Sequence, residues 1–124
     1  MNDLASGHVT VVAFWSPDCW FSVRDLGPLQ HLADQLQHAG AEVVAIVDHP
    51  FSAELTRTLK EQHAERLPVF YDYRSDTRRA FINFASPDYF VLDESGRIVF
   101  AHSKLEEIPR QVAALLPERT ASTH

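Results

Sequence analysis

The chain has one cysteine, Cys19, among its 124 residues. An internal disulfide is therefore impossible, so the fold cannot depend on one, and the cysteine count leaves the redox compartment open. The chain also lacks a run of basic residues, and 11 Lys and Arg against 17 Asp and Glu give a formal charge of -6, which argues against nucleic acid as a partner. No apolar stretch approaches the roughly 20 residues that a membrane span requires.

The N-terminal stretch MNDLASGH has neither the basic region nor the apolar region of a secretory signal. We therefore expect a cytoplasmic protein, or an exported one if a leader or a larger parent chain has been removed. The 45% hydrophobic and 10% aromatic residues are enough for a core, so residues 1–124 are predicted to form a single domain. Its core should span about residues 4–116, followed by a flexible tail at 117–124.

The hydrophobic periodicity changes along the chain in an order typical of an α/β protein. β-Branched runs predict buried strands, leucines at helical spacing predict a helix that ends at Gly40, and Glu94-Ser95-Gly96 predicts a hairpin turn. In chain order we expect strand 8–14, a helix up to Gly40, strand 41–48, helix 52–67 capped by Ser52, an extended piece at 68–73, a short helix at 75–84, strands 88–93 and 97–102, and a last helix at 104–116.

This order of elements implies a three-layer α/β domain whose first two strands are parallel. In such sheets, sites form at the carboxyl ends of the parallel strands, where the loops converge. Cys19 follows the first strand, and Asp48 and His49 follow the second. An antiparallel third strand would bring its own start, Ser86-Pro87-Asp88, to the same edge. Three separate segments are therefore expected to meet around one sulfur.

Two motifs resemble those of a known family. The stretch VVAFWSPDC is similar to the strand ending in Phe-Trp-Ala-x-Trp-Cys of the thioredoxin superfamily, and SPDYFVLDESGRIVF is similar to its Pro-Thr-x-x-x-Ile-Asp-x-x-Gly-x-Ile hairpin. The insertion LPVFYDYRSDTRRAFINF resembles the additional strand and helix of the TlpA/ResA-like branch, which is related to AhpC/TSA proteins. The resemblance covers roughly residues 4–116. It implies a thioredoxin-like three-layer sandwich with a mixed central sheet, helices on both faces and the inserted strand and helix.

The resemblance implies roles for three residues. Cys19 matches the attacking cysteine of the family, and Pro87 matches its cis-proline, which together with Ser86 presents backbone to an extended substrate. A thiol in the first turn of a helix lies near the positive end of the helix dipole and near unpaired N–H groups, which favour the thiolate. We therefore expect a lowered pKa for Cys19.

The sequence departs from the family pattern at the cysteine motif. Ser22 stands where the resolving cysteine would be, so Cys19 could form a mixed disulfide but an external thiol would have to release it. The buried acid of thioredoxins is replaced by Ala13, which removes a proton acceptor. Asp18 replaces the tryptophan that precedes the cysteine, and its negative charge opposes thiolate formation.

Several residues near Cys19 have two interpretations. Cys19 itself is either a reactive thiol or a small buried apolar residue. Trp20 and Phe21 either form an exposed platform for a partner or fold inward over the sulfur. His49 is either a solvated loop histidine or a proton donor or acceptor near Cys19.

The remaining histidines and arginines indicate no cofactor. His31 and His38 are seven residues apart on the first helix, but nothing nearby completes a metal site, so we expect a solvated face and no bound metal. Arg78 and Arg79 are expected to pair with nearby acids such as Asp76.

Three function classes remain open. The first is a monothiol thiol-disulfide oxidoreductase, in which Cys19 attacks a protein or a low-molecular-weight disulfide and Ser22 donates a hydrogen bond to the thiolate. The second is a non-catalytic interaction domain that binds protein through the aromatic pair after the cysteine. The third is a one-cysteine peroxidase, indicated by Ser16 three residues before the cysteine, although Val12 stands where the peroxiredoxin motif opens with proline.

Overall fold

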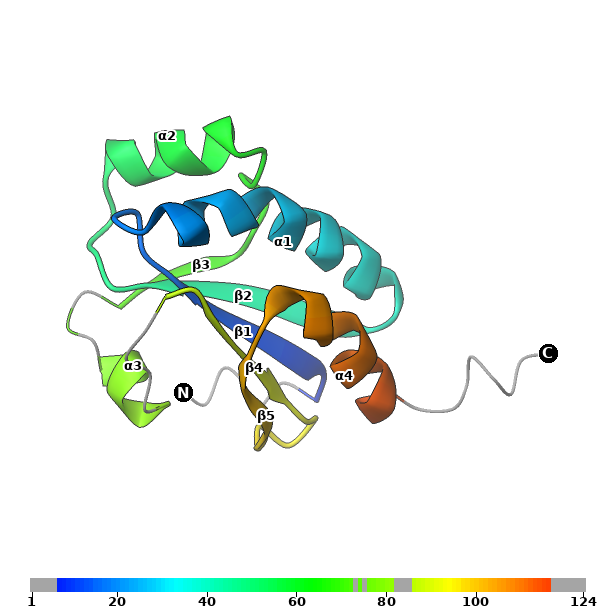
Figure 1. The fold of residues 1–124 in the computed structure, drawn as a ribbon. Helices are drawn as coiled ribbons and strands as arrows, with labels where there is room; N and C mark the ends of the chain where they lie inside the picture. Colours follow the sequence, from blue (N-terminus) through cyan, green and yellow to red (C-terminus); the bar gives the residue numbers. More distant parts are fainter. Residues whose placement is uncertain (1–6, 73, 75, 82–85, 117–124) are drawn as a thin grey trace.

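The computed structural model describes residues 7–72, 74, 76–81 and 86–116, and its elements follow the order expected from the sequence. The elements are β1 (Val9–Trp15), α1 (Trp20–His38), β2 (Ala41–Val47), α2 (Ala53–Glu61), β3 (Val69–Tyr71), α3 (Asp76–Ala80), β4 (Asp88–Leu92), β5 (Ile98–Ser103), the 3-10 turn η2 (Leu105–Glu107) and α4 (Ile108–Leu115), as drawn in Figure 1.

The strands of the described chain form one sheet in the order β3-β2-β1-β4-β5. β1 runs parallel to β2, in register from Val9 opposite Ala41 to Trp15 opposite Val47, and β2 runs parallel to β3. β4 lies antiparallel to both β1 and β5, and Gly96 has φ 88° in the turn that joins β4 to β5. The predicted parallel pair and the predicted antiparallel hairpin are both confirmed.

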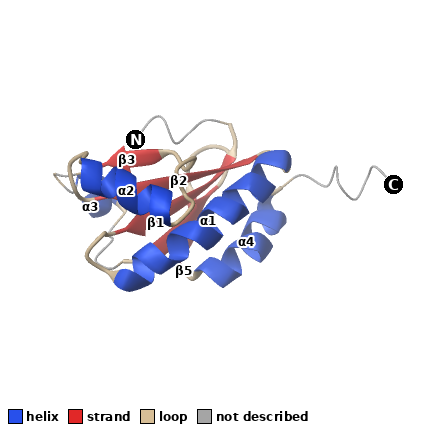
Figure 2. Cartoon of the chain, turned by 90° about the horizontal axis from the view of Figure 1, so that it is seen from above, coloured by secondary structure: helices blue, strands red, loops and turns tan. Residues whose placement is uncertain are grey.

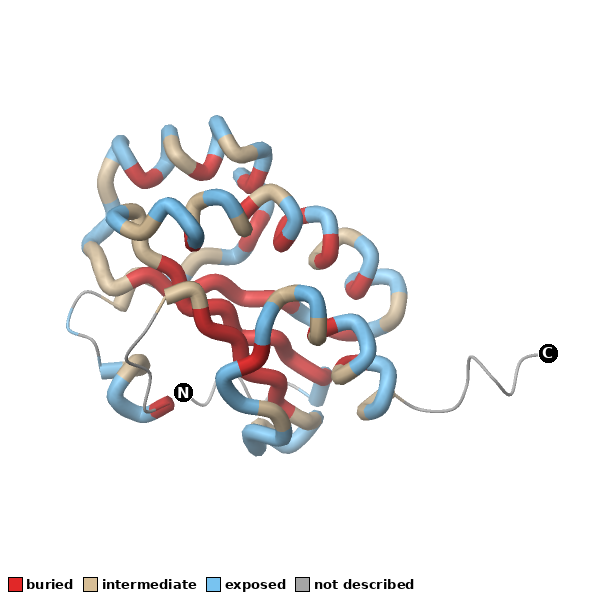
Figure 3. Tube along the Cα trace, viewed as in Figure 1, coloured by how far each residue is buried: buried red, intermediate tan, exposed pale blue. Residues whose placement is uncertain are grey.

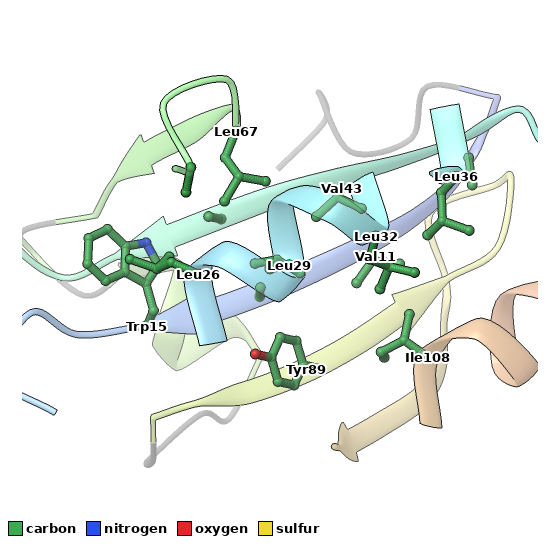
Figure 4. Packing of buried hydrophobic residues seen from close by; sticks show 14 of the residues in the cluster. Val11, Trp15, Leu26, Leu29, Leu32, Leu36, Val43, Leu67, Tyr89 and Ile108 are labelled. Atoms are coloured by element: carbon green, nitrogen blue, oxygen red, sulfur yellow. The ribbon is translucent and has the colours of Figure 1, made fainter. Parts of the chain in front are cut away.

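Helices cover both faces of this sheet: α1, α2 and α4 lie on one face and α3 lies on the other (Figures 1 and 2). Side chains alternate along a strand, so Val11 and Trp15 of β1 pack on the first face and Val12 and Phe14 on the second. Figure 4 shows the first-face core, to which α1 contributes Leu26, Leu29, Leu32 and Leu36. The predicted three-layer sandwich, with a mixed sheet and helices on both faces, is confirmed.

The second face has a smaller core built around three aromatic rings. Phe14, Phe81 and Phe90 contact one another edge to face, with ring centroids 5.1 to 5.6 Å apart. Such pairs add about 0.5–1.5 kcal/mol each beyond the apolar area they bury. Phe81 directly follows α3, so this cluster holds the inserted helix against the sheet. Figure 3 shows that the central strands are buried along their length.

α2 is shorter than predicted. It begins as expected, with Ser52 as its N-cap accepting a hydrogen bond from the Leu55 N–H, but it ends at Glu61 instead of continuing to residue 67. His63 adopts φ 58°, and the His63 and Ala64 N–H groups bond back to Lys60 and Leu59. This is a Schellman ending with histidine in the position that glycine usually takes.

Some predicted segments lie partly outside the described residues. The predicted helix at 75–84 is observed as α3, but residues 75 and 82–85 are not described; neither are residues 4–6 of the predicted core nor the predicted tail at 117–124. The last predicted helix is a 3-10 turn followed by α4. Pro109 lies in the first turn of α4, where a backbone N–H would have no helical partner in any case.

Among the described residues, no helix combines the length and apolar character needed to cross a membrane.

Candidate active site

Cys19 lies at the junction between β1 and α1 and is the N-cap residue of α1. A tight turn after β1 places it there: the Cys19 N–H donates to the Ser16 carbonyl at 3.1 Å, and the Asp18 N–H donates to the Ser16 hydroxyl at 3.2 Å. The Cys19 carbonyl accepts the first helical hydrogen bond, from the Val23 N–H. The sulfur thus sits at the positive end of a 19-residue helix.

The start of β4 reaches the same sulfur from a distant part of the chain. The Ser86–Pro87 peptide bond is cis, as predicted from the family resemblance. The Cys19 S–H donates to the Ser86 carbonyl at 3.2 Å, so the proline lies next to the thiol. Pairing of β4 antiparallel to β1 explains this contact, because the end of one strand meets the start of the other.

The pKa of the Cys19 thiol is lowered from its ordinary value. The largest cause is the backbone N–H of Ser22, which favours the negatively charged sulfur. The Ser22 hydroxyl and the Phe21 N–H lower the pKa further, whereas burial and the negative charge of Asp25 raise it. The net direction is the one expected for a thiol beside unpaired N–H groups at a helix start.

Ser22 is buried, with 1% of its surface exposed. While the thiol is protonated it donates to Ser86, and the Ser22 hydroxyl has no hydrogen-bond partner in the described part of the chain. The same hydroxyl lowers the pKa of Cys19, because it can donate to the ionised sulfur. An unsatisfied buried polar group costs about 1–3 kcal/mol, so forming the thiolate satisfies a group that the thiol state leaves unsatisfied.

Asp25 and Tyr89 form a polar pair near the sulfur that sequence reasoning missed. The Tyr89 hydroxyl donates to Asp25 Oδ2 at 2.9 Å. Figure 4 shows the Tyr89 side chain on the side of β4 that faces α1. Burial raises the pKa of Tyr89 strongly, and the charge of Asp25 and the hydrogen bond to it add to the effect. A signal was available for Asp25, which lies one helical turn after Ser22 and so shares its side of α1. No signal in the sequence pairs it with Tyr89.

Trp20 and Phe21 are exposed and do not fold over the sulfur, so the first of the two predicted arrangements is observed. Their side chains are 62% and 46% exposed, and their rings stack with centroids 4.1 Å apart and planes at 28°. The Arg24 guanidinium lies over both rings, 5.0 Å and 5.1 Å from the centroids. These three side chains form an aromatic and cationic surface on the first turns of α1, directly after the thiol.

His49 lies between two carboxylates. Its Nδ1 is 2.9 Å from Asp48 Oδ1 and its Nε2 is 3.3 Å from Asp18 Oδ2. The Asp18 side chain is 83% exposed and turns toward His49. His49 therefore links the loop that follows β2 to the loop that carries Cys19, and both of its ring nitrogens face carboxylates.

Arg78 and Arg79 have different partners. Arg79 pairs with Asp76, as predicted, and both side chains are exposed. Arg78 reaches Asp48 at the end of β2 instead, and both of these side chains are largely buried. Asp72 accepts hydrogen bonds from the first N–H groups of α3 and so orients the helix that carries both arginines. The inserted helix is thereby joined to the loop that contains His49.

His31 and His38 are exposed on α1, in agreement with the solvated face predicted from the sequence. Within the residues that the structure describes, no group of three or more His, Cys, Asp or Glu side chains could hold a metal ion.

Two cavities are lined by residues that adjoin Cys19, one by Pro87 and the other by Asp18. The first, about 380 Å³, lies beside Pro87 and is lined by Arg24, Asp25, Tyr89, Ser103, Lys104, Leu105 and Glu106. The second, about 300 Å³, lies between the loop that carries Asp18 and the first turns of α2; its lining includes His49. We call these the proline cavity and the histidine cavity.

A helix-capping cysteine beside a cis-proline, on a mixed sheet with helices on both faces, defines a thioredoxin-like fold of the kind found in thiol-disulfide oxidoreductases. The chain belongs to the AhpC/TSA family, whose model matches residues 1–101. None of the curated proteins matches the chain.

Solved structures share the fold at low sequence identity. A Chlorobium tepidum protein described as thiol:disulfide interchange protein DsbE has a TM-score of 0.79 at 20% identity, covering 94% of this chain and 85% of its own. The thioredoxin domain of a thiol-disulfide oxidoreductase from Bacteroides vulgatus has a TM-score of 0.75 at 16% identity, covering 94% and 84%.

A third structure is a secreted Mycobacterium tuberculosis disulfide oxidoreductase homologous to E. coli DsbE. Its TM-score is 0.74 at 17% identity, and the match covers 90% of this chain and 84% of that protein. At these identities the likeness establishes the thioredoxin-like fold.

Proposed function

We propose that this protein is a monothiol thiol-disulfide oxidoreductase in which Cys19 forms mixed disulfides that an external thiol resolves. The observation that carries the proposal is the lowered pKa of a thiol placed beside a cis-proline, in a chain with no second cysteine. The Cys19 thiolate attacks one sulfur of a disulfide, forms a new S–S bond and releases the other sulfur as a thiolate. An external thiolate then attacks the mixed disulfide and releases Cys19.

The surrounding residues have distinct roles in this proposal. The Ser22 hydroxyl and N–H donate to the thiolate and stabilise it. Once the thiol ionises, it no longer donates to Ser86, and the Ser86 carbonyl is free to accept from the backbone of an extended substrate beside Pro87. Trp20 and Phe21 offer apolar contact to the chain that carries the disulfide. The partner is a protein or a low-molecular-weight thiol or disulfide.

The exposed aromatic pair also supports a second candidate, a non-catalytic domain that binds protein through Trp20 and Phe21. Contiguous exposed aromatic rings are unusual unless they meet a partner. The peroxidase alternative gains no such support. Ser16 is engaged with the Asp18 N–H, and Arg78 is engaged with Asp48.

Mixed-disulfide formation tests the proposal directly. Treating the purified protein with glutathione disulfide should add one glutathione at Cys19, detected by mass spectrometry, and the adduct should persist until thiol is added. Iodoacetamide should alkylate Cys19 faster at pH 7 than it alkylates a cysteine peptide, whose pKa is about 8.5. Cys19→Ser is the control for the adduct. Slow alkylation together with no adduct would favour the non-catalytic domain.

Restoring a second sulfur gives a sharper test. In Ser22→Cys, a second thiol lies one helical turn from the mixed disulfide and can attack it internally. The glutathione adduct should then decay at least about tenfold faster, and insulin reduction with limiting dithiothreitol should rise above the near-zero activity expected of the native sequence. Ala13 limits the gain, because no buried acid is there to accept the proton.

The compartment decides which external thiol completes the cycle. The secreted M. tuberculosis protein, which shares the fold, supports the exported one of the two expected locations. In either compartment the mechanism requires the same reactants: a disulfide that Cys19 attacks and a separate thiol that releases it.

A further inference from the structure

The histidine cavity combines apolar walls with an acidic rim. Its walls include Pro17 from the loop before Cys19, Pro50 from the loop after β2, and Leu55 from α2. The carboxylates of Asp18 and Glu54 and the hydroxyls of Ser52 and Thr58 complete the lining. An aliphatic stem with a cationic head fits such a cavity, because the stem packs on the apolar walls while the head meets the carboxylates.

The formal charges on the lining of this cavity are net negative. Asp48 is balanced by its largely buried ion pair with Arg78, so its charge is already matched. The Asp18 side chain is 83% exposed, and its carboxylate lies 3.3 Å from His49 Nε2. Glu54 is exposed and makes no ion pair in the described part of the chain, not even with Arg57 one turn away on α2. The cavity therefore has two solvent-facing carboxylates, Asp18 and Glu54, and a single histidine near them.

The proline cavity differs in this respect. Two cations, Arg24 and Lys104, line it together with two carboxylates, Asp25 and Glu106, so its formal charges balance. Asp25 is also held by the Tyr89 hydroxyl. Of these two cavities, the histidine cavity is therefore the one that can select for the sign of a partner's charge.

Exposed aromatic residues follow, or lie within, the two loops that line the histidine cavity, although they are not part of its lining. Trp20 and Phe21 follow the loop that carries Asp18, and Phe51, which is 70% exposed, lies between Pro50 and Ser52. Aromatic side chains are the usual anchors of protein interfaces. Three of the six large apolar side chains exposed in the described chain thus lie at this one edge of the sheet.

From this arrangement we infer that Cys19 acts on a protein partner whose disulfide cysteine is flanked by lysine or arginine, with the basic side chain entering the histidine cavity. The aromatic side chains pack on apolar surface around that cysteine, and Asp18 and Glu54 pair with the basic head group. The covalent step of this inference rests on the proposed function, whereas the docking step does not.

Two short peptides test the covalent step. Each has one central cysteine carried as a mixed disulfide with 2-nitro-5-thiobenzoate; the cysteine has lysine on both sides in one peptide and glutamate on both sides in the other. The Cys19 thiolate attacks the peptide sulfur, and the released thiobenzoate anion is followed by absorbance. The lysine peptide should react about fivefold faster than the glutamate peptide at low salt, and the preference should shrink at high salt.

Variants locate the preference. The ratio of the two peptide rates cancels any change in the intrinsic reactivity of Cys19, so it reports only on recognition. The ratio should fall below about twofold in Glu54→Gln and approach unity when Asp18→Asn is added. Glu61→Gln, an exposed acid on the same helix outside the cavity, is the matched control and should keep the ratio. Equal rates in the native protein, or an equal loss in the control, would overturn the inference.

A binding experiment separates this inference from the proposed function. Fluorescein-labelled peptides with serine in place of cysteine should bind by fluorescence polarisation, with the lysine peptide about fivefold tighter than the glutamate peptide. If Cys19 fails to react with either disulfide but this preference persists, the docking surface stands and the oxidoreductase proposal falls. If Cys19 reacts with both peptides equally and binding shows no preference, the oxidoreductase proposal stands and this inference falls.

Discussion

Cys19 has an aspartate on each side, and the two carboxylates differ in exposure, partner and effect. Asp18 is its neighbour in sequence, but its side chain is 83% exposed and turns to His49. Asp25 is six residues away, but its side chain is 19% exposed, is held by Tyr89, and raises the pKa of the thiol. A charge acts more strongly through a half-buried region than through water and salt. Closeness in sequence is therefore a poor guide to which acid controls the sulfur.

The largest difference between the Asp25–Tyr89 pair and the Asp18–His49 pair should appear in the free energy of unfolding. Tyr89→Phe removes the hydrogen bond from the Tyr89 hydroxyl to a largely buried carboxylate, which should lower the free energy of unfolding by about 2 kcal/mol. His49→Gln should cost less than about 1 kcal/mol, because the contacts of His49 with Asp18 and Asp48 lie partly in water. Urea unfolding of both variants measures the difference. Equal losses would mean that the Tyr89–Asp25 hydrogen bond is no stronger than an exposed pair.

The Tyr89 contribution also has a defined pH dependence. Its pKa is raised in the folded protein, so its stabilising effect is fully present below the unfolded tyrosine pKa of about 10 and is lost progressively as pH rises above that value. The native protein should therefore lose stability between pH 10 and pH 11 by more than Tyr89→Phe does. Thermal unfolding scans across this range measure the two slopes. Parallel slopes would show that Tyr89 does not titrate abnormally.

The next effect concerns the reactivity of the Cys19 thiol and its dependence on Asp25. Asp25→Asn removes a negative charge that raises the pKa of Cys19, so the pKa should fall and the thiolate fraction at pH 7 should rise. Lower basicity makes each thiolate slightly less nucleophilic, so the net gain in alkylation rate should be about threefold. Iodoacetamide alkylation followed from pH 6 to pH 10 gives both the midpoint and the rate. A midpoint that moves upward would contradict the assigned direction.

Asp18 should have the smallest effect on the reactivity of Cys19. Asp18→Asn should change the rate of Cys19 alkylation by less than about 1.5-fold, because the lost charge is exposed and screened. The same titration serves as the measurement, and raising the salt concentration should reduce the effect further. An effect of Asp18→Asn equal to that of Asp25→Asn would remove the contrast between the two sides.

Much of the fold could be predicted because its signals are local. The β-branched runs of β1 and β2, the leucine spacing of α1 and the Ser52 cap of α2 each depend on neighbouring residues. The end of α2 was predicted wrongly because residues 62–67 have the composition of a helix. The chain turns at His63 so that Ala64 and Leu67 can pack in the core, and this gain depends on distant residues.

The site was predicted where it repeats a known motif. The position of Cys19 before a helix came from the local sequence pattern, and the cis bond at Pro87 came from the family resemblance. The partners of ionisable groups were harder to predict, since they come from separate elements. Arg78 pairs with Asp48, directly after β2, although Asp76 is much closer in sequence.

By itself, the sequence determined that one sulfur would stand at the start of a helix with no second sulfur to release its disulfides, because these properties depend only on residue identity and local periodicity. Only the tertiary structure decided what surrounds that sulfur. Pairing of β4 with β1 brings Ser86 and Tyr89 to α1, and the loop after β2 brings His49 to Asp18. Burial and electrostatic interactions depend on distances between atoms, and those distances exist only once the sheet has formed.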